Sequence, residues 1–367
     1  MLNWPGRPLS SDTTRRLLAP GFATVLVVAA LAASSILAAR PARGAGTSDD
    51  HAGSPTRWTS QPPLLRARVG LGVATVGGQI LAIGGFDAGD PLVDVVEARR
   101  RTGIGTWRDL AAPMPTPRAN HATAEVGGLV YAVSGFDRTN TVVNVVEVFH
   151  PRSGRWTNGV PLPRPRAAAG VAALGGLLYV AGGGVLLANG EDELANSMIV
   201  YDPRRRVWRS AAPMPTARDR HRLVASGGYL YAIGGRDERN QTLTTVERYD
   251  PRSDSWRTMN PMRESRYLPC VVETVVGNQR VVLAVGGIEH NADGEIVKVR
   301  RTSEVFNLHT GRWTLLDVLL PVGRVSHDCA VQPNGTVLAI GGGSPVGGTP
   351  RYLADVDALS LKPRDLR

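Results

Sequence analysis

The sequence predicts an all-β protein assembled from six repeats, and three recurring features carry this prediction. The first is an apolar run that ends in a pair of glycines, the second is a tryptophan, and the third is an arginine between each tryptophan and the next glycine pair. The runs read ILAIGGFD, VYAVSGFD, LYVAGGGV, LYAIGGRD, VLAVGGIE and VLAIGGGS. Their pairs begin 48 to 55 residues apart, and a constant period of this size is typical of stacked supersecondary units.

The three features occupy regular positions along the chain. The pairs consist of Gly84, Gly85, Ser134, Gly135, Gly182, Gly183, Gly234, Gly235, Gly286, Gly287, Gly341 and Gly342. The tryptophans are Trp58, Trp107, Trp156, Trp208, Trp256 and Trp313, and only Trp4 lies outside the series. The arginines are Arg68, Arg118, Arg166, Arg218, Arg266 and Arg324. We expect structural roles for the glycines and tryptophans, because a residue without Cβ lets neighbouring backbone approach and an indole can cover the next sheet.

Each repeat reads as four short strands. The first starts at the arginine, the second is the apolar run, the third contains Val-Glu and an aromatic residue, and the fourth contains the tryptophan. Val, Ile, Tyr and Trp suit a half-buried pleated surface, whereas Gly, Pro, Asp and Asn interrupt it. No segment after residue 55 has a sustained helical period of apolar residues, so we expect helix to be nearly absent there.

The combination of arginine, Gly-Gly, Glu-x-aromatic, Asp-Pro and tryptophan resembles the kelch-repeat family over residues 56–363. The resemblance implies a β-propeller with four antiparallel strands per blade. Six repeats imply six blades, and the alternative of seven requires a blade without the signature. The last repeat lacks its own tryptophan, so we expect the N-terminal strand around Trp58 to complete it and to leave no open sheet edge. Local departures are Ser134, Ile199 in place of a glutamate, and ARRRTGIGTW in place of the usual turn.

The chain divides into four segments. Residues 1–45 contain an uncharged stretch of nineteen residues, Gly21–Ala39, which we expect to form one hydrophobic helix. This helix is a cleaved signal peptide or a membrane anchor, and both interpretations imply an exported protein, of bacterial type, that is secreted or displayed at the cell surface. Residues 46–55 read as a polar linker, residues 56–363 as the propeller and residues 364–367 as a tail.

The charge argues against a nucleic-acid partner. The formal net charge is +10, and removal of residues 1–45, which hold five arginines and one aspartate, leaves +6. The basic residues form no lysine-rich run and no patch interleaved with aromatic residues.

The arginines are the candidate ligand-binding residues. Strands one and two of a blade run antiparallel, so the start of the first and the end of the second lie at the same end. We therefore expect the repeat arginines, and Arg236 directly after a glycine pair, around the mouth of the central channel. Guanidinium groups form two-point hydrogen bonds with carboxylates and phosphates, and kelch domains that capture acidic peptides use matching arginines. The candidates, in order, are Arg166, Arg218, Arg236, Arg68, Arg118, Arg266 and Arg324.

A structural role for the same arginines is the alternative. Acidic residues recur on the third strand, and buried Arg–Glu pairs would tie strands together. These residues are Glu97, Glu147, Glu247, Glu304 and Asp357. The third repeat has Ile199 at this position, so Arg166 is the arginine that we expect to lack a partner and to face a ligand.

Histidines and cysteines recur on the first strands. His121, His221 and His327 follow alternate arginines by three residues. A shared metal ion would need all three nitrogens at about 2.0–2.1 Å, whereas alternate blades lie too far apart across a channel, so we expect no metal and hydrogen-bonded core or channel histidines. Cys270 and Cys329 start the first strands of adjacent blades, and they form either a disulfide or, the favoured interpretation, two buried thiols.

These features predict a binding or interaction module outside the cytoplasm, with an arginine-lined mouth that binds an acidic peptide, glycan or protein partner. We expect a monomer without a cofactor. The alternative is a sugar-acting enzyme similar to the sialic-acid mutarotases, in which Glu191, Asp192 or Glu193 supplies an acid/base carboxylate. Neither cysteine has the sequence context of a galactose-oxidase-like copper site.

Overall fold

The computed structural model describes residues 56–88, 92–110, 112–186, 192–291, 294–346 and 349–366. Nearly all regular structure in these ranges is β-strand, and the one helix among them is the short 3₁₀ helix η2 (Pro363–Leu366). The prediction of an all-β protein with almost no helix is therefore confirmed. The expected N-terminal hydrophobic helix and the linker at 46–55 lie outside the described residues. No helix within the described ranges is long and apolar enough to span a membrane.

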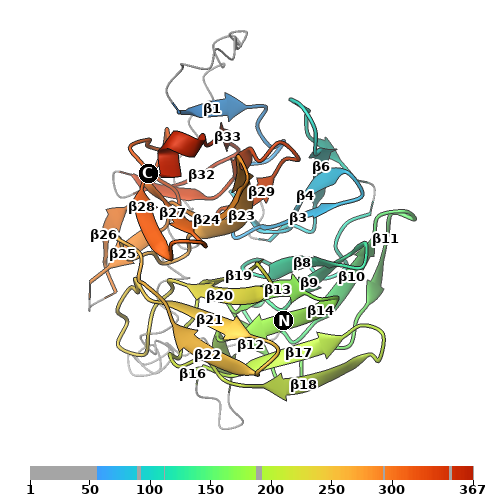
Figure 1. Ribbon diagram of the computed structural model, residues 1–367. Coiled ribbons are helices and arrows are strands. Elements are labelled where there is room, and N and C mark those ends of the chain that lie inside the picture. Colours follow the sequence, from blue (N-terminus) through green and yellow to red (C-terminus); the bar gives the residue numbers. More distant parts are fainter. Residues whose placement is uncertain are drawn as a thin grey trace, which may run out of the picture.

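The strands of each repeat form a four-stranded antiparallel sheet, and the described residues contain six such sheets (Figure 1). Sheet 1 contains β3 (Gly72–Val76), β4 (Gln79–Ile83), β6 (Val96–Arg100) and β7 (Arg108–Asp109). Sheet 2 contains β8 (Ala122–Val126), β9 (Leu129–Val133), β10 (Val146–His150) and β11 (Arg155–Asn158). Sheet 3 contains β13 (Gly170–Leu174), β14 (Leu177–Ala181), β17 (Met198–Asp202) and β18 (Val207–Ala211).

The remaining sheets follow the same order. Sheet 4 contains β19 (Arg222–Ser226), β20 (Tyr229–Ile233), β21 (Val246–Asp250) and β22 (Ser255–Thr258). Sheet 5 contains β23 (Cys270–Val276), β24 (Gln279–Val285), β27 (Ser303–Asn307) and β28 (Arg312–Leu315). Sheet 6 contains β29 (Asp328–Val331), β30 (Val337–Ile340), β33 (Val356–Leu359) and β1 (Trp58–Gln61).

Short additional strands lie outside the six sheets and come before or after the glycine pairs in the sequence. They are β2 (Arg68–Val69) with β5 (Phe86–Asp87), β12 (Arg166–Ala167) with β15 (Gly184–Leu186) and β16 (Asp192–Leu194), β25 (Ile288–His290) with β26 (Ile296–Val299), and β31 (Gly343–Val346) with β32 (Thr349–Tyr352). In repeats 3, 5 and 6, the described residues between the second and third strands thus include a pair of antiparallel strands.

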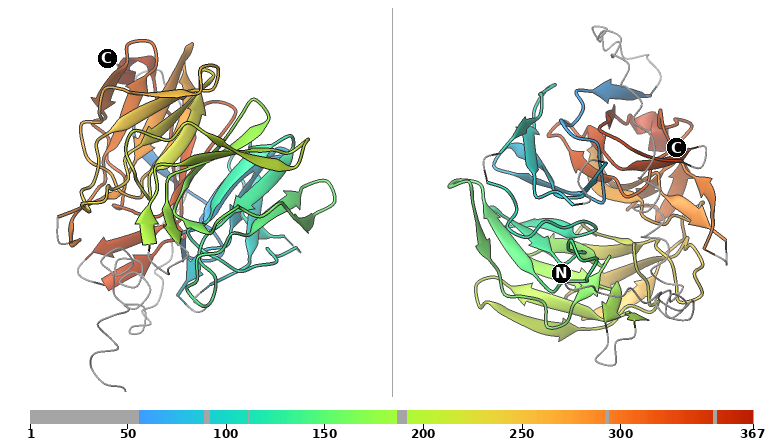
Figure 2. Two further views of the ribbon diagram at one scale, coloured as in Figure 1. Left: turned by 90° about the horizontal axis from the view of Figure 1, so that it is seen from below. Right: turned by 180° about the vertical axis from the view of Figure 1, so that it is seen from behind.

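The six sheets contact one another in a closed cycle. Their inner strands gather at the centre of Figure 1, and each contacts the inner strand of the next sheet, with β29 returning to β3. The view from behind in Figure 2 shows the same arrangement. Strand β1 pairs antiparallel with β33, with Trp58 opposite Leu359, so the N-terminal strand completes sheet 6 as expected.

The hydrophobic core lies between neighbouring sheets. The cluster between sheets 6 and 1, for example, joins Leu338 and Ile340 of β30 to Ile80 of β4. The second strand of each repeat is covered on both faces by such clusters, which explains its unbroken apolar sequence. Two glycines with positive φ, such as Gly77 (55°) and Gly78 (74°), close the hairpin between the first two strands in a tight turn.

The repeat tryptophans connect each sheet to the one before it. Trp256 Nε1 donates a hydrogen bond of 2.8 Å to the carbonyl oxygen of Ala212, and Trp313 Nε1 donates one of 3.1 Å to that of Asn260. Each of these two acceptors follows the fourth strand of the preceding sheet, so these two indoles cover the junctions between repeats.

Candidate functional site

The six repeat arginines lie inside the sheets. Five are 0% exposed and Arg166 is 6% exposed. Their guanidinium groups donate hydrogen bonds to backbone carbonyls of their own repeat; Arg68 Nη1, for example, lies 2.8 Å from Gly84 O. Five of them form the expected buried ion pairs with acidic residues. The pairs are Arg68–Glu97, Arg118–Glu147, Arg218–Glu247, Arg266–Glu304 and Arg324–Asp357.

The glycine pairs connect each repeat to the next through the same arginines. Gly85 N donates to Arg118 O at 3.0 Å, and Gly342 N donates to Arg68 O at 2.8 Å, which closes the cycle. A Cβ at Gly182 (φ 64°) would lie 2.5 Å from Arg218 O. The arginine and the glycine pair therefore recur together. The arginine side chain binds to its own repeat, and its backbone carbonyl accepts a hydrogen bond from the glycine pair of the preceding repeat.

Arg166 has no carboxylate partner among the described residues and still points inward. Its Nη1 donates to Gly182 O and Ser197 O, both at 2.9 Å, and its Nη2 donates to Ser197 Oγ at 2.9 Å. In sheet 3, Ile199 lies opposite Val180, where sheet 2 places Glu147 opposite Ala132. Burial lowers the pKa of Arg166 to about 10.

This placement corrects the expected position of the six repeat arginines. Arg68, Arg118, Arg166, Arg218, Arg266 and Arg324 lie beneath their own glycine pairs and do not line the channel pocket. The reason is local backbone geometry. Two residues after each arginine the chain adopts positive φ and turns, so that the following residues, rather than the arginine, face the ring axis.

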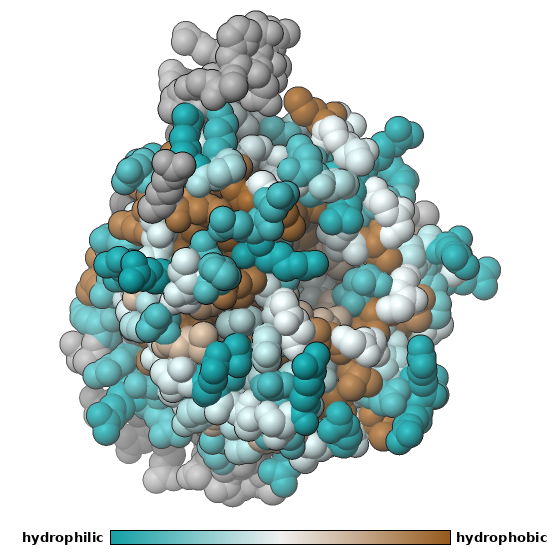
Figure 3. All heavy atoms as spheres, viewed as in Figure 1, coloured by the Kyte–Doolittle hydropathy of each residue, from teal (hydrophilic) through white to brown (hydrophobic). Residues whose placement is uncertain are grey.

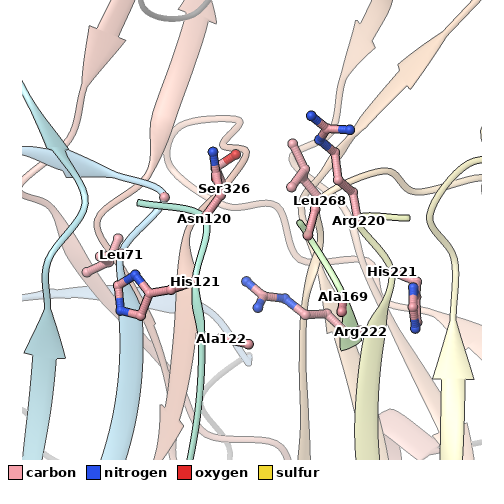
Figure 4. Close-up of a pocket in the computed structure, with 12 residues that line it drawn as sticks. Leu71, Asn120, His121, Ala122, Ala169, Arg220, His221, Arg222, Leu268 and Ser326 are labelled. Atoms are coloured by element: carbon pink, nitrogen blue, oxygen red, sulfur yellow. The ribbon is translucent and has the colours of Figure 1, made fainter. Parts of the chain in front are cut away.

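A pocket lies on the ring axis and is formed by residues two to four positions after the arginines (Figure 4). It spans about 420 Å³ of space, open solvent included. The residues at the second position all have φ between 51° and 68°; they are Gly70, Asn120, Ala168, Arg220, Leu268 and Ser326. Backbone hydrogen bonds connect this belt, including Asn120 N to Gly70 O (2.8 Å), Arg220 N to Ala168 O (2.8 Å) and Gly70 N to Ser326 O (2.9 Å).

The pocket is electropositive. Its charged lining residues are Arg220 and Arg222, and the lining residues within the described chain include no aspartate or glutamate. Figure 4 shows the Arg222 side chain extending into the pocket from the start of β19. Arg222 Nε donates to Pro269 O at 2.8 Å, and Nη2 donates to His327 O at 2.9 Å and lies 3.6 Å from Asp328 Oδ1. Its side chain is 25% exposed, so part of the guanidinium faces the open space.

Arg220 is held by a second cluster at the same end of the ring. Asp219 forms ion pairs with both Arg220 and Arg236, the latter with 2.9 Å between Arg236 Nε and Asp219 Oδ1. The Arg220 and Arg236 Cζ atoms lie 5.5 and 5.7 Å from the ring centroid of Tyr267. Burial raises the pKa of Tyr267 to about 12, so the phenol stays neutral beside the two cations. Arg236 is thus buried and paired with protein groups, and it is not among the described residues that line the pocket.

The repeat histidines are buried beside the inner strands. Burial lowers the pKa of His121 to about 3 and lowers the pKa values of His221 and His327 well below the usual range. The ring nitrogens of His221 and His327 have no hydrogen-bond partner among the described residues, so the expectation of hydrogen-bonded histidines is wrong for these two. The three histidines do not form a shared ligand cluster within the described ranges.

The two cysteines form a disulfide. Cys270 and Cys329 are bonded, with a Cα–Cα distance of 5.8 Å. The favoured expectation of two buried thiols is therefore wrong, because Cys270, the first residue of β23, and Cys329, the second residue of β29, face each other across the junction of sheets 5 and 6.

The acidic loop of repeat 3 is described only in part. Glu191 lies outside the described residues, Asp192 begins β16, and Glu193 is exposed. Glu193 does not line the pocket. Its carboxylate is thus not placed beside Arg220 or Arg222.

Sequence reasoning missed Arg220 and Arg222. The signal that could have revealed them is the comparison of the residues after each arginine. The fourth repeat reads RDRHR, whereas the second and third read RANHA and RAAAG. Arginine at the second and fourth positions is thus specific to the fourth repeat among these.

Comparisons with known proteins agree with this architecture. The model of the kelch motif matches residues 67–98, 117–163, 165–215 and 217–263. Kelch-like protein 34 of Homo sapiens is 31% identical over 162 residues, which are 41% of this chain and 23% of that protein. Kelch domain-containing protein 7A of Mus musculus is 38% identical over 93 residues, 25% of this chain and 11% of that protein. The matched parts thus span about a quarter or less of these relatives.

A solved structure shows the same fold over most of the chain. The chain described as "Structure of YjhT" superposes with a TM-score of 0.69 and 16% identity, and the match covers 83% of this chain and 98% of that chain. At this identity the likeness concerns the fold alone. The motif matches and the similar relatives agree with the recurring hydrogen bond between glycine pair and arginine carbonyl. We conclude that the chain belongs to the kelch-repeat family.

Proposed function

We propose that the protein is a binding module, a six-bladed kelch propeller whose axial pocket takes up an acidic group of a protein, peptide or glycan partner. Kelch-repeat propellers typically mediate protein interactions, which supports the general role. The observation that carries the acidic preference is the pocket lining, in which Arg220 and Arg222 are the charged residues. A carboxylate entering this partly open pocket would meet these cations and could form charge-assisted hydrogen bonds, which are stronger than hydrogen bonds between neutral groups.

The roles of the two arginines differ. Arg222 reaches into the pocket with its guanidinium partly exposed, so we assign it the direct contact with the ligand. Arg220 is 7% exposed and fixed by Asp219, so it contributes a positive potential from the wall. The side chains of Asn120 and Ser326, at the belt, offer further hydrogen bonds to an oxyanion.

We also propose that the propeller works outside the cytoplasm. The uncharged stretch Gly21–Ala39 supports export, whether as a signal peptide or as an anchor. The disulfide between Cys270 and Cys329 supports an oxidising compartment, because disulfides persist there and are rare in the cytosol.

A thermal-shift screen tests the acidic preference. The probes are a glutamate-containing peptide, an acidic sugar and inorganic phosphate, each against the full-length protein. We expect at least one to raise the melting temperature of the wild type, and Arg222→Gln to weaken its binding by roughly 10–150-fold, which corresponds to one hydrogen bond to a charged group worth about 1.5–3 kcal/mol.

The matched control is Arg252→Gln, which removes the same charge from the exposed turn between β21 and β22. The control should leave binding unchanged. The melting temperature of Arg222→Gln without probe shows whether the lost contacts to Pro269 and His327 have destabilised the fold. Equal affinity of the two variants would place the site elsewhere, and no response to any acidic probe would overturn the acidic preference.

A further inference from the structure

Cys270, Cys329 and His327 form a compact group at the junction of sheets 5 and 6. Their potential ligand atoms, two sulfurs and an imidazole nitrogen, all lie within 4.8 Å of one another. The exposed fractions are 0% for Cys270, 7% for Cys329 and 0% for His327. Neither ring nitrogen of His327 has a hydrogen-bond partner in the described chain, so the imidazole is a buried donor of an unused lone pair.

The other repeats show what is specific to this group. A Cβ built at Gly72 would lie 2.9 Å from His121 Nε2, and one built at Gly170 would lie 2.5 Å from His221 Nε2. The position four residues after the arginine therefore touches the histidine of the next sheet at three junctions. It is glycine at two of them and Cys270 at the third.

The second cysteine also stands at a position that contacts the neighbouring sheet in other repeats. Two residues after the histidine stand Thr123, Leu223 and Cys329. The Gly72 Cβ would meet Thr123 Cγ2 at 2.5 Å, and the Gly170 Cβ would meet Leu223 Cβ at 2.9 Å. The repeat geometry thus brings three sequence positions together at each of these junctions. At one junction, all three positions hold residues that can bind a metal ion.

Two thiolates and an imidazole match the ligand preferences of zinc. Ligands bound at about 2.3 Å for sulfur and 2.0–2.1 Å for nitrogen lie no more than about 4.6 Å apart, so small side-chain rotations would bring the three atoms around one ion. Zn²⁺ with two thiolates and a neutral imidazole carries no net charge. This suits the apolar surroundings, which include Val285, Leu283 and Val337.

We propose that the group is a redox-controlled zinc site. In the oxidised state the disulfide joins sheets 5 and 6 and leaves no thiolate for a metal. A phosphine or dithiol reductant supplies two electrons that break the S–S bond, and each sulfur takes up one proton. Zn²⁺ then displaces both protons to solvent and binds Cys270 Sγ, Cys329 Sγ and a His327 ring nitrogen, with a fourth position open.

The test uses full-length protein before and after treatment with a phosphine reductant. Each sample is incubated with Zn²⁺, desalted and assayed for bound metal, and a parallel sample receives Co²⁺ as a spectroscopic substitute. We expect the reduced protein to retain one zinc ion per chain and to show the absorption band of thiolate-to-Co²⁺ charge transfer. The oxidised protein should retain none.

Variants identify the ligands. Cys329→Ser and His327→Asn should each abolish zinc retention by the reduced protein, and Cys329→Ser should also remove the Co²⁺ band. His221→Asn is the matched control, because it alters the same repeat position at a junction without cysteines, and it should retain zinc normally. Tryptophan fluorescence reports whether each reduced sample is folded.

Three results would overturn the proposal. They are absence of metal from the folded, reduced wild type, equal retention by His327→Asn and wild type, and loss of the native fluorescence on reduction. The last result would mean that the ligands, which come from two sheets, no longer face each other. None of these results depends on whether the axial pocket binds acids.

Discussion

Arg68 and Arg166 occupy the same position in two repeats, but of these two only Arg68 has a carboxylate partner within the described residues. Replacing each by methionine therefore compares a paired buried arginine with an unpaired one. Arg68 Nη2 lies 3.0 Å from Glu97 Oε1, and both side chains are fully buried. Arg68→Met would leave the Glu97 carboxylate with the backbone N–H of Leu65, at 2.7 Å, as its remaining donor. Removing one member of a buried ion pair typically costs about 3–5 kcal/mol, and we expect a loss of this size in the free energy of unfolding.

Arg166→Met removes a buried cation that has no counter-ion in the described part of the chain. Stranded carbonyl acceptors cost about 1–3 kcal/mol. Against this, burial lowers the pKa of Arg166 to about 10, so keeping the buried guanidinium charged costs on the order of 3 kcal/mol. The two effects nearly cancel, so we expect a net loss of no more than about 2 kcal/mol.

Urea unfolding followed by tryptophan fluorescence measures both variants, and its pH dependence provides a second readout. Burial raises the pKa of Glu97 above its usual 4.5, and Arg68 opposes this rise. Without Arg68 the folded state binds a proton more tightly than the unfolded state, so stability falls as pH rises above 4.5. The loss in Arg68→Met should therefore be smaller at pH 5 than at pH 8. Equal losses for the two variants at both pH values would refute the reasoning.

Two further predictions concern the junctions between repeats. Gly182→Ala should lower the melting temperature clearly more than Gly176→Ala does. Both glycines have positive φ, but of the two only Gly182 would place its Cβ against a backbone oxygen, Arg218 O at 2.5 Å. Equal melting temperatures would contradict the close contact between glycine pair and arginine carbonyl. The free energy of unfolding should fall as pH drops below 6.5, because His121, with a pKa of about 3 when folded, takes up a proton on unfolding. His121→Gln should reduce this slope by up to about 1.4 kcal/mol per pH unit in urea titrations at pH 5 and 7, and an unchanged slope would show that His121 is not its source.

The repeat pattern was sufficient to predict the architecture. The spacing of the glycine pairs and tryptophans predicted four-stranded antiparallel sheets, and the missing tryptophan of the last repeat predicted the pairing of β1 with β33. Such features are visible in sequence because each sheet repeats the same contacts. The five acidic partners of the arginines were likewise predictable from their constant place on the third strand.

The site was harder to predict because it depends on one turn of the backbone. The antiparallel direction of the first two strands alone placed the arginines around the channel, but the positive φ at residues such as Gly70 and Asn120 redirects the chain immediately after them. Asn at such a position is compatible with left-handed backbone, whereas Arg220 and Leu268 give no signal of it. The side chains that face the axis are therefore found only by aligning the repeats residue by residue from the arginine onward.

The disulfide depends on register between sheets, which the sequence does not encode locally. Cys270 and Cys329 were known to begin adjacent inner strands, but a shift of one residue would have directed one side chain to the opposite face. Gly72 and Gly170 indicate the register between neighbouring sheets that the strand pattern leaves open. They mark the place where the neighbouring sheet approaches most closely, and Cys270 stands at the same place in its repeat.

The most direct test of the account is a crystal structure of the full-length protein with the acidic probe that gives the largest thermal shift. The account predicts a carboxylate or phosphate oxygen at about 2.7–3.2 Å from the guanidinium of Arg222, on the ring axis beside Asn120 and Ser326. An acidic probe bound on the outer strands, with the axial pocket holding only water, would contradict it.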